Sequence, residues 1–248
     1  MKSRWSRLWP PAAAVLLLLL LWQAAVVLLD IERWMLPSPL DVLRELAANP
    51  PVEHTLATAR LTAIGFPIGT LVGIGTAVLL HLLPWTRRAF YPLLVLSQNI
   101  PTIALAPLLV IWFGFGLLPK IILITLVCFF PVAVAMMGGL GGSDRAMRNY
   151  MQMAGAGRWT IFRKLELPSS LPPLFSGIRI SAAYAVTGAV VAEWLGSDRG
   201  LGNYMQLQKA AYRTDRMFVA IFIIVALSLL LFALVALLER WLVRWNRN

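Results

Sequence analysis

The sequence predicts an all-α membrane protein with about six transmembrane helices, a helical cytoplasmic segment and both termini in the cytoplasm. Three observations support this fold class. The chain of 248 residues is 59% hydrophobic and only 13% charged, with a mean hydropathy of +0.75. A soluble domain carries about a quarter charged residues, so this chain has too little polar surface to coat a water-soluble globule. Long apolar runs also recur along the chain, and basic residues lie between them.

Each apolar run is long enough to form a helix that crosses a bilayer and satisfies its own backbone amides in lipid. The longest apolar stretch is divided by glycines and a proline over 114–119, which is typical of a turn. The predicted spans are 11–29, 61–83, 89–113, 117–137, 174–195 and 217–238.

The first run resembles a secretory signal peptide in one respect, because Lys2, Arg4 and Arg7 precede it. It is long for the apolar region of a signal peptide, and no clear small-x-small cleavage site follows it. We therefore expect a retained first span.

The basic residues indicate how the spans are oriented. With the N-terminus in the cytoplasm, inside segments hold 13 of the 22 Lys and Arg residues and outside segments hold eight. The long outer segments count for less under the positive-inside rule. The net charge of +11 is therefore explained by membrane topology and contact with lipid, with no need for a nucleic-acid partner. We expect a multi-pass protein of the bacterial cell membrane.

The chain divides into two parts. Residues 1–59 are expected to hold the first span and an external amphipathic segment, in which Leu40 to Ala48 predicts a short helix between prolines. Residues 60–248 are expected to form the main transmembrane domain, with 138–173 in the cytoplasm.

The cytoplasmic segment begins with a predicted helix. Ser143 or Asp144 can cap it, because their side-chain oxygens accept hydrogen bonds from free backbone amides. We expect it to run to Ala154 and to end at Gly155 and Gly157, since glycine adopts the left-handed conformation at helix ends.

A second helix is predicted from Arg158, and Pro168, Pro172 and Pro173 are expected to end it before the fifth span. Two short helices at nearly a right angle suit a groove on a soluble partner. From the pattern alone, an interfacial helix on the lipid headgroups is an equal alternative.

The stretch from Gly155 to Pro168 resembles the cytoplasmic signature of ABC importer permeases. That signature has Glu-Ala-Ala, three residues, Gly, nine residues and then Ile-x-Leu-Pro. Aligned on Gly155, its ending falls on residues 165–168, whereas Asn149, Tyr150 and Met151 occupy the Glu-Ala-Ala positions. The sequence thus departs from the part that gives the motif its name.

Four further stretches resemble one branch of this family, which imports nitrate, sulfonates, taurine and thiamine or riboflavin precursors. They are Ile100–Pro107, Trp112–Gly116, Ser176–Arg179 and Val191–Gly196.

The resemblance implies a transport subunit that is not itself an enzyme. Its expected partners are a cytoplasmic ABC ATPase dimer, an external substrate-binding protein and a second permease copy. The chain lacks a Gly-x-x-x-x-Gly-Lys-Ser/Thr loop, so ATP and Mg²⁺ are expected on the ATPase and no cofactor on this chain. The residues implied in ATPase coupling are Asn149, Tyr150, Met151, Ala154, Gly155, Ala156, Gly157, Leu165, Leu167 and Pro168.

A polar patch beside Pro101 is the candidate for lining a transport pathway. It comprises Ser97, Gln98, Asn99 and Thr102. Proline frees backbone carbonyls that can line a cavity. The alternative is that these polar groups satisfy one another and the kinked backbone.

Glu193 is a further pathway candidate, because an ionisable group at a span is a functional hypothesis. A group at a helix end that faces the outer headgroups is an equal alternative. Gly65, Gly69 and Gly73 predict close helix packing, near a dimer contact. His54 and His81 have no partner at ligand spacing, so no metal site is expected.

Cys128-Phe129-Phe130-Pro131 is similar to the thiamine- or riboflavin-precursor group, which favours a small organic solute of that kind. The alternative within the family is a sulfonate, taurine or nitrate-type anion. Outside it, an ion-coupled secondary carrier would need more ionisable groups at mid-membrane than Glu193. A membrane scaffold without transport activity is the remaining alternative.

Overall fold

The computed structural model describes residues 5–97 and 99–243, without the side chains of residues 5–8, 84, 87, 95 and 97. Every regular element in these ranges is helical, which confirms the predicted fold class. The elements are α1 (Trp5–Leu28), α2 (Pro39–Ala48), α3 (Val52–Leu82), α4 (Pro84–Ser97), α5 (Thr102–Phe113), α6 (Leu117–Gly141), α7 (Arg145–Met153), α8 (Arg158–Ile161), the π-helix η1 (Phe162–Glu166), α9 (Leu167–Glu193), α10 (Leu201–Ala210) and α11 (Thr214–Leu242).

Five helical segments among the described residues are long and apolar enough to cross a membrane. They correspond to five of the six predicted spans. The remaining predicted span, 89–113, is instead divided between α4 and α5. Pro101 caps the start of α5 in an extended conformation, because the residues around a proline that lacks an amide proton seldom continue a helix.

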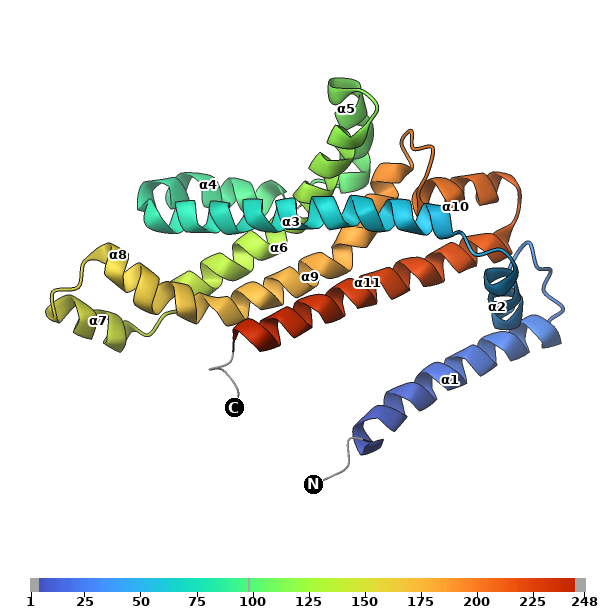
Figure 1. Cartoon of the computed structure of the whole chain (residues 1–248), viewed down its shortest axis with the longest axis horizontal. Coiled ribbons are helices and arrows are strands. Elements are labelled where there is room, and N and C mark those ends of the chain that lie inside the picture. The colour runs from blue at the N-terminus through green and yellow to red at the C-terminus, as the bar shows by residue number, and fades with distance from the viewer. Residues whose placement is uncertain (1–4, 98, 244–248) are drawn as a thin grey trace.

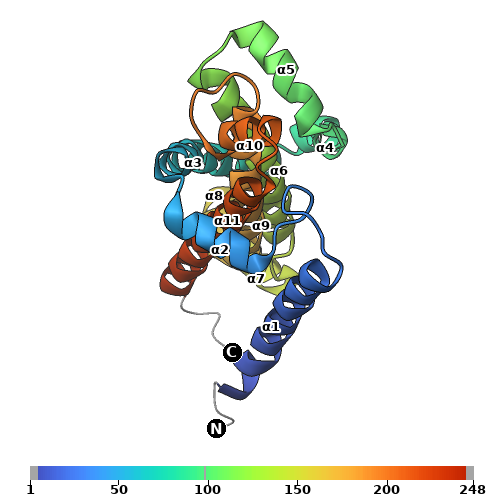
Figure 2. The same ribbon diagram turned by 90° about the vertical axis from the view of Figure 1, so that its right-hand side faces the viewer.

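The long helices run side by side along the long axis of the molecule (Figure 1). α6 packs most extensively against α9 and α3, and α11 packs against α9. The α7 and α8 helices lie at one end, which we call the α7 end, and α2 and α10 lie at the other, the α10 end. Figure 2 shows α1 and α5 on opposite sides of this bundle, with α5 packed against α6 and Trp22 of α1 in contact with Phe218 of α11.

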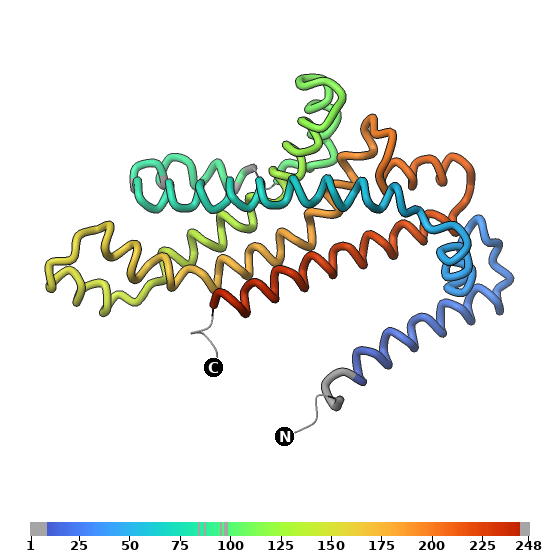
Figure 3. The backbone as a smooth tube through the Cα atoms, in the orientation of Figure 1, coloured from blue at the N-terminus to red at the C-terminus, as the bar shows by residue number. Residues whose placement is uncertain are grey.

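The chain crosses from end to end in alternation, as the tube in Figure 3 shows. α1 runs towards the α10 end, and α11 runs back from it towards the α7 end. The first and last spans therefore have their outer chain ends on the same side, the relation that the predicted topology requires.

Small residues set the distance between α3 and α6. Gly65, Gly69 and Gly73 are buried against α6, and a Cβ on Gly69 would lie 2.7 Å from the Cβ of Cys128. In a membrane no hydrophobic force drives helices together, so their association depends on close packing. Small residues such as these allow it, because they let two helix backbones approach closely. The glycine face thus packs within one chain rather than at a dimer contact.

The predicted external amphipathic helix is present as α2. The Ser38 hydroxyl accepts from the amide of Asp41, and the Asp41 carboxylate reaches back to Ser38, which forms a capping box. Val42 faces inwards, while the Glu45 carboxylate accepts from Arg216 at the start of α11 at 2.7 Å. This arrangement holds α2 across the end of the bundle.

The prediction that prolines end the second cytoplasmic helix is wrong. Helical structure continues from Arg158 to Glu193 through all three prolines. The wider π-turn of η1 precedes Pro168, and the hydroxyls of Ser169 and Ser170 donate to carbonyls of the preceding turn. A wider turn of this kind can accommodate a proline, so helical structure in a membrane bundle can continue past it.

Candidate functional site

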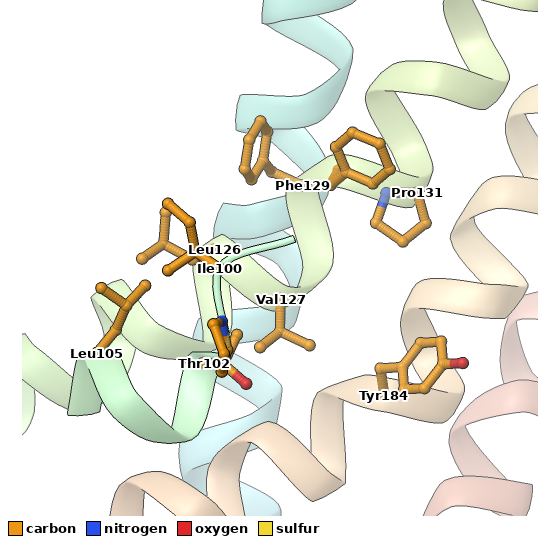
Figure 4. A pocket seen from close by; sticks show the side chains of 10 residues that line it. Ile100, Thr102, Leu105, Leu126, Val127, Phe129, Pro131 and Tyr184 are labelled. Carbon is orange, nitrogen blue, oxygen red and sulfur yellow. The ribbon is translucent and has the colours of Figure 1, made fainter. Parts of the chain in front are cut away.

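A cavity of about 520 Å³ opens where α5, α6 and α9 meet. It lies beside Phe129, near the middle of α6, and Tyr184 of α9 closes one side of it. Figure 4 shows Leu105 and Thr102 of α5 opposite Tyr184, with Phe129 and Pro131 of α6 along a third side. The cavity therefore lies at mid-span.

The lining of this cavity is uncharged and rich in aromatic rings. Phe129 and Phe130 lie edge to face, with ring centroids 6.4 Å apart. The hydroxyls of Thr102 and Tyr184 are the polar side-chain groups among the described lining residues. Cavities that bind small organic molecules usually combine apolar and aromatic walls with a few polar groups that fix orientation.

The predicted pathway residues separate in the structure. Thr102 lines the cavity, whereas Asn99 is exposed at the turn before α5. Gln98 and the side chain of Ser97 lie outside the described residues. The sequence pattern did not point to Tyr184, and it linked Phe129, Phe130 and Pro131 to a substrate group but not to a cavity. An aromatic pair beside a proline within a span was the available signal.

Glu193 is far from this cavity and is 2% exposed at the α10 end. The Thr58 hydroxyl of α3 lies 2.8 Å from one carboxylate oxygen of Glu193, and the amide of Gly202 donates to the other at 2.8 Å. The Thr58 hydroxyl also accepts from the amide of Leu201 at 2.8 Å. We call Thr58, Glu193 and Gly202 the Glu193 cluster; it joins α3, α9 and the start of α10.

Neighbouring side chains reinforce this junction. The ring of His54 on α3 lies 3.1 Å from the carbonyl oxygen of Gly200 and packs against Tyr204 on α10. Burial raises the pKa of the Tyr204 phenol above its ordinary value, so this group stays neutral. A side chain at Gly200, which has a φ of +118°, would collide with the Glu193 carboxylate. The junction is closely packed and leaves no room for a solute.

The segment predicted to couple to an ATPase forms the tip of the α7 end. Asp144 caps α7 as predicted, and its carboxylate accepts from Ala146 at 2.8 Å. Gly155 has a φ of +80°, which gives the predicted turn. The remaining predicted coupling residues follow in order: Asn149, Tyr150 and Met151 on α7, Ala154, Ala156 and Gly157 in the turn, Leu165 in η1, and Leu167 and Pro168 at the start of α9.

This tip exposes large apolar side chains. Tyr150 is 65% exposed, Met153 80% and Trp159 63%, and no residue of α7 is buried. Apolar side chains gathered at a polar end of the molecule mark an interaction surface.

Behind the tip, Glu166 is held by two basic side chains. Its carboxylate oxygens lie 2.7 Å from Nε2 of His81 and 2.8 Å from Nη2 of Arg148. We call these three residues the Glu166 cluster. A cavity of about 310 Å³ borders it, also lined by Gln152 and Arg158. Among the described residues, no group of three His, Cys, Asp or Glu side chains could hold a metal ion.

Comparison with known proteins identifies the family of this chain. Residues 65–244 match the model of a family described as the binding-protein-dependent transport system inner membrane component. The formylaminopyrimidine transport permease protein of Halalkalibacterium halodurans is 35% identical, covering 87% of this chain and 87% of that protein. The riboflavin transport system permease protein of Chloroflexus aurantiacus is 35% identical, covering 91% and 86%. A putative aliphatic sulfonates transport permease protein of Bacillus subtilis is 30% identical, covering 86% and 79%.

The fold is also similar to a chain of the inward-facing MetNI methionine ABC transporter, with a TM-score of 0.65 and 20% identity, covering 80% of this chain and 96% of that one. The chain belongs to the family of binding-protein-dependent inner membrane transport components and is the permease component of an ABC importer.

Proposed function

We propose that this permease imports a small, uncharged, ring-containing solute similar to a thiamine or riboflavin precursor. The observation that carries the proposal is the mid-span cavity, whose walls offer aromatic rings and hydroxyls but no charge among the described residues. A flat heterocycle can stack on Phe129 or Phe130 and bond to the hydroxyls of Thr102 and Tyr184. The two relatives that are 35% identical are named for formylaminopyrimidine and riboflavin transport.

A sulfonate-type anion is the second candidate, because a relative at 30% identity is named for aliphatic sulfonates. Such an anion would lose its water in the cavity without meeting a cationic side chain, which is costly. The nearest arginine in sequence to Tyr184, Arg179, already pairs with Glu239 of α11 at 3.4 Å. The cavity therefore favours an uncharged solute.

We further propose that the tip of the α7 end faces the cytoplasm and docks into a separate ABC ATPase. The exposed side chains of Tyr150, Met153 and Trp159 supply the apolar contact, and the basic residues of this segment fit the positive-inside rule. ATP and Mg²⁺ would be bound by that ATPase, and a second copy of the permease would complete the pathway. An external binding protein would deliver the solute at the α10 end.

The first experiment is to tag the chain, cross-link it in its native membrane and identify its partners by mass spectrometry. An ATPase cross-linked within residues 144–168 would support the docking proposal. A binding protein that co-purifies would then be tested for binding of formylaminopyrimidine, riboflavin and taurine. Binding of taurine alone would contradict the uncharged solute, and repeated absence of an ATPase would contradict the docking proposal.

The cavity itself is tested by substitution. Phe130→Ala should lower uptake of the bound solute by about tenfold, because base–aromatic stacking contributes about 1–3 kcal/mol. Phe113→Ala is the matched control, since Phe113 is 49% exposed at the end of α5 and does not line the cavity. Equal uptake by the two variants would exclude Phe130 as the stacking ring, and equal uptake by Phe129→Ala as well would contradict the cavity as the binding site.

A further inference from the structure

The Glu166 cluster connects α3 to two elements that come much later in the sequence, α7 and η1. His81 lies in the last turn of α3, Arg148 lies on α7, and Glu166 ends the π-helix that leads into α9. The side chains of Glu166 and His81 are 10% and 14% exposed, and that of Arg148 is 32% exposed. The Arg148 guanidinium also donates to Ser143 at 2.6 Å, which ties it to the chain just before α7.

Burial makes the carboxylate of Glu166 dependent on both partners. Removing an ion from water costs several kcal/mol, and this cost is offset only while the partners remain in hydrogen-bonding contact. A displacement of Arg148 therefore leaves the Glu166 charge uncompensated unless Glu166 follows. Because Glu166 also contacts His81, the same displacement acts on α3 and α9 together.

α7 has few other connections to the bundle. None of the α7 residues is buried. In the part of the chain that the structure describes, the Arg148–Glu166 pair is the side-chain polar bond between α7 and the bundle. The Phe162 ring of η1 packs against the His81 ring, with centroids 6.1 Å apart, so the π-helix is joined to α3 by a second contact. Single π-turns within helices occur frequently at functional sites.

We propose that Glu166 is the positioning residue through which movement of α7 reaches α3 and α9. The proposal rests on the proposed function, in which a partner ATPase displaces α7. α9 carries Tyr184 on the wall of the mid-span cavity, 18 residues or about 27 Å of helix beyond Glu166. Movement of the α7 end is thereby transmitted to the cavity. Without the Glu166 charge, the ATPase still hydrolyses ATP, but the shape of the cavity no longer changes in response.

The test needs no knowledge of the solute. Tyr184→Cys places a thiol at the cavity in a Cys128→Ala background, and the complex with its co-purified ATPase is labelled with a maleimide in the presence and absence of ATP. We expect ATP to change the labelling rate about tenfold, within the range of typical coupling between sites. With Glu166→Gln added, this change should fall below about twofold while ATP hydrolysis continues.

Glu239→Gln is the matched control. It makes the same substitution in another ion pair, between Glu239 of α11 and Arg179 of α9, and in the described part of the chain no ion pair links Glu239 to α7. Its labelling should respond to ATP as the parent does. Should Glu166→Gln assemble poorly, Arg148→Gln serves as the second variant, because it removes the link to α7 and leaves the His81–Glu166 pair. An unchanged ATP response in Glu166→Gln, or in Arg148→Gln, would overturn the proposal.

Failure of the proposed function gives a different result. If the parent Tyr184→Cys complex contains no ATPase, or its labelling ignores ATP although ATP is hydrolysed, both proposals are overturned at that stage. A normal response in the parent that persists without the Glu166 carboxylate overturns only the inference about Glu166.

Discussion

The two ends of the α3–α9 pair are joined by a carboxylate in each case, but the two junctions differ in construction. At the α10 end, Glu193 is almost fully buried and is bonded to a hydroxyl and to a backbone amide. At the α7 end, Glu166 is bonded only through side chains, to His81 and Arg148, beside an open cavity. A backbone donor moves only when α10 itself moves, whereas an arginine side chain can change partners.

This difference indicates which end of the molecule can move. The Glu193 cluster fixes the α10 ends of α3 and α9 relative to each other. The Glu166 cluster holds the opposite ends through contacts that can be remade. Rigid helices joined firmly at one end and adjustably at the other behave as a hinge, a common basis of transporter motion. Four substitutions test the comparison.

The largest effect is expected at Gly202, in the Glu193 cluster. Gly202→Ala places a Cβ against the carbonyl oxygen of Val190 and 2.9 Å from the Cβ of Glu193. We expect the free energy of unfolding to fall by about 3–5 kcal/mol, because the added methyl group overpacks the junction and pushes the Glu193 carboxylate away from its buried hydrogen-bond donors. Thermal unfolding in detergent measures it. Gly138→Ala, with open space around it, is the control, and equal stability of the two variants would contradict a closely packed junction.

A smaller loss is expected for Thr58→Val, which keeps the side-chain shape but removes the hydroxyl shared by Glu193 and Leu201. Leaving buried groups without a partner costs about 1–3 kcal/mol. Thr62→Val is the control, because the Thr62 hydroxyl donates only within its own helix, to the carbonyl of Thr58. The ATP response of the cavity thiol should survive Thr58→Val; its loss would show that the α10 end also transmits movement.

His81→Gln should have the opposite profile at the α7 end. We expect about 1 kcal/mol of lost stability, because glutamine can still donate a hydrogen bond to Glu166. The ATP response of the cavity thiol should nevertheless weaken, since the aromatic contact with Phe162 is lost as well. Thermal unfolding and maleimide labelling on the same preparation separate the two effects. A large stability loss with a normal response would make the Glu166 cluster a static junction like the other.

The smallest effect is expected for Arg158→Gln. Arg158 is exposed and donates to the carbonyl oxygen of His81 at 3.3 Å, without contacting Glu166 in the described structure. Substitutions at such positions usually change stability by less than about 0.5 kcal/mol. Thermal unfolding should not distinguish this variant from the parent. A clear destabilisation would mean that the cluster extends further along α8.

Local chemistry allowed much of the fold to be predicted. Apolar run length located five spans, and Asp144 and Gly155 set the ends of the tip helix through capping and a left-handed turn. The prolines of α9 were misinterpreted because the rule that proline ends a helix holds in water. In a membrane bundle the helix can continue past proline, and here a π-turn directly precedes Pro168.

The sequence by itself determined that the chain is a membrane permease whose α7 end carries a short capped helix, because hydropathy, charge distribution and helix ends depend on neighbouring residues. Only the tertiary structure decided what the ionisable groups do. Thr58 and Glu193 are 135 residues apart, and His81 and Glu166 are 85 apart, and no spacing rule connects them. Their contacts arise because α3 and α9 pack alongside each other in opposite directions, which makes Glu193 part of a fixed junction. Thr102 lies at the cavity because α5 packs against α6.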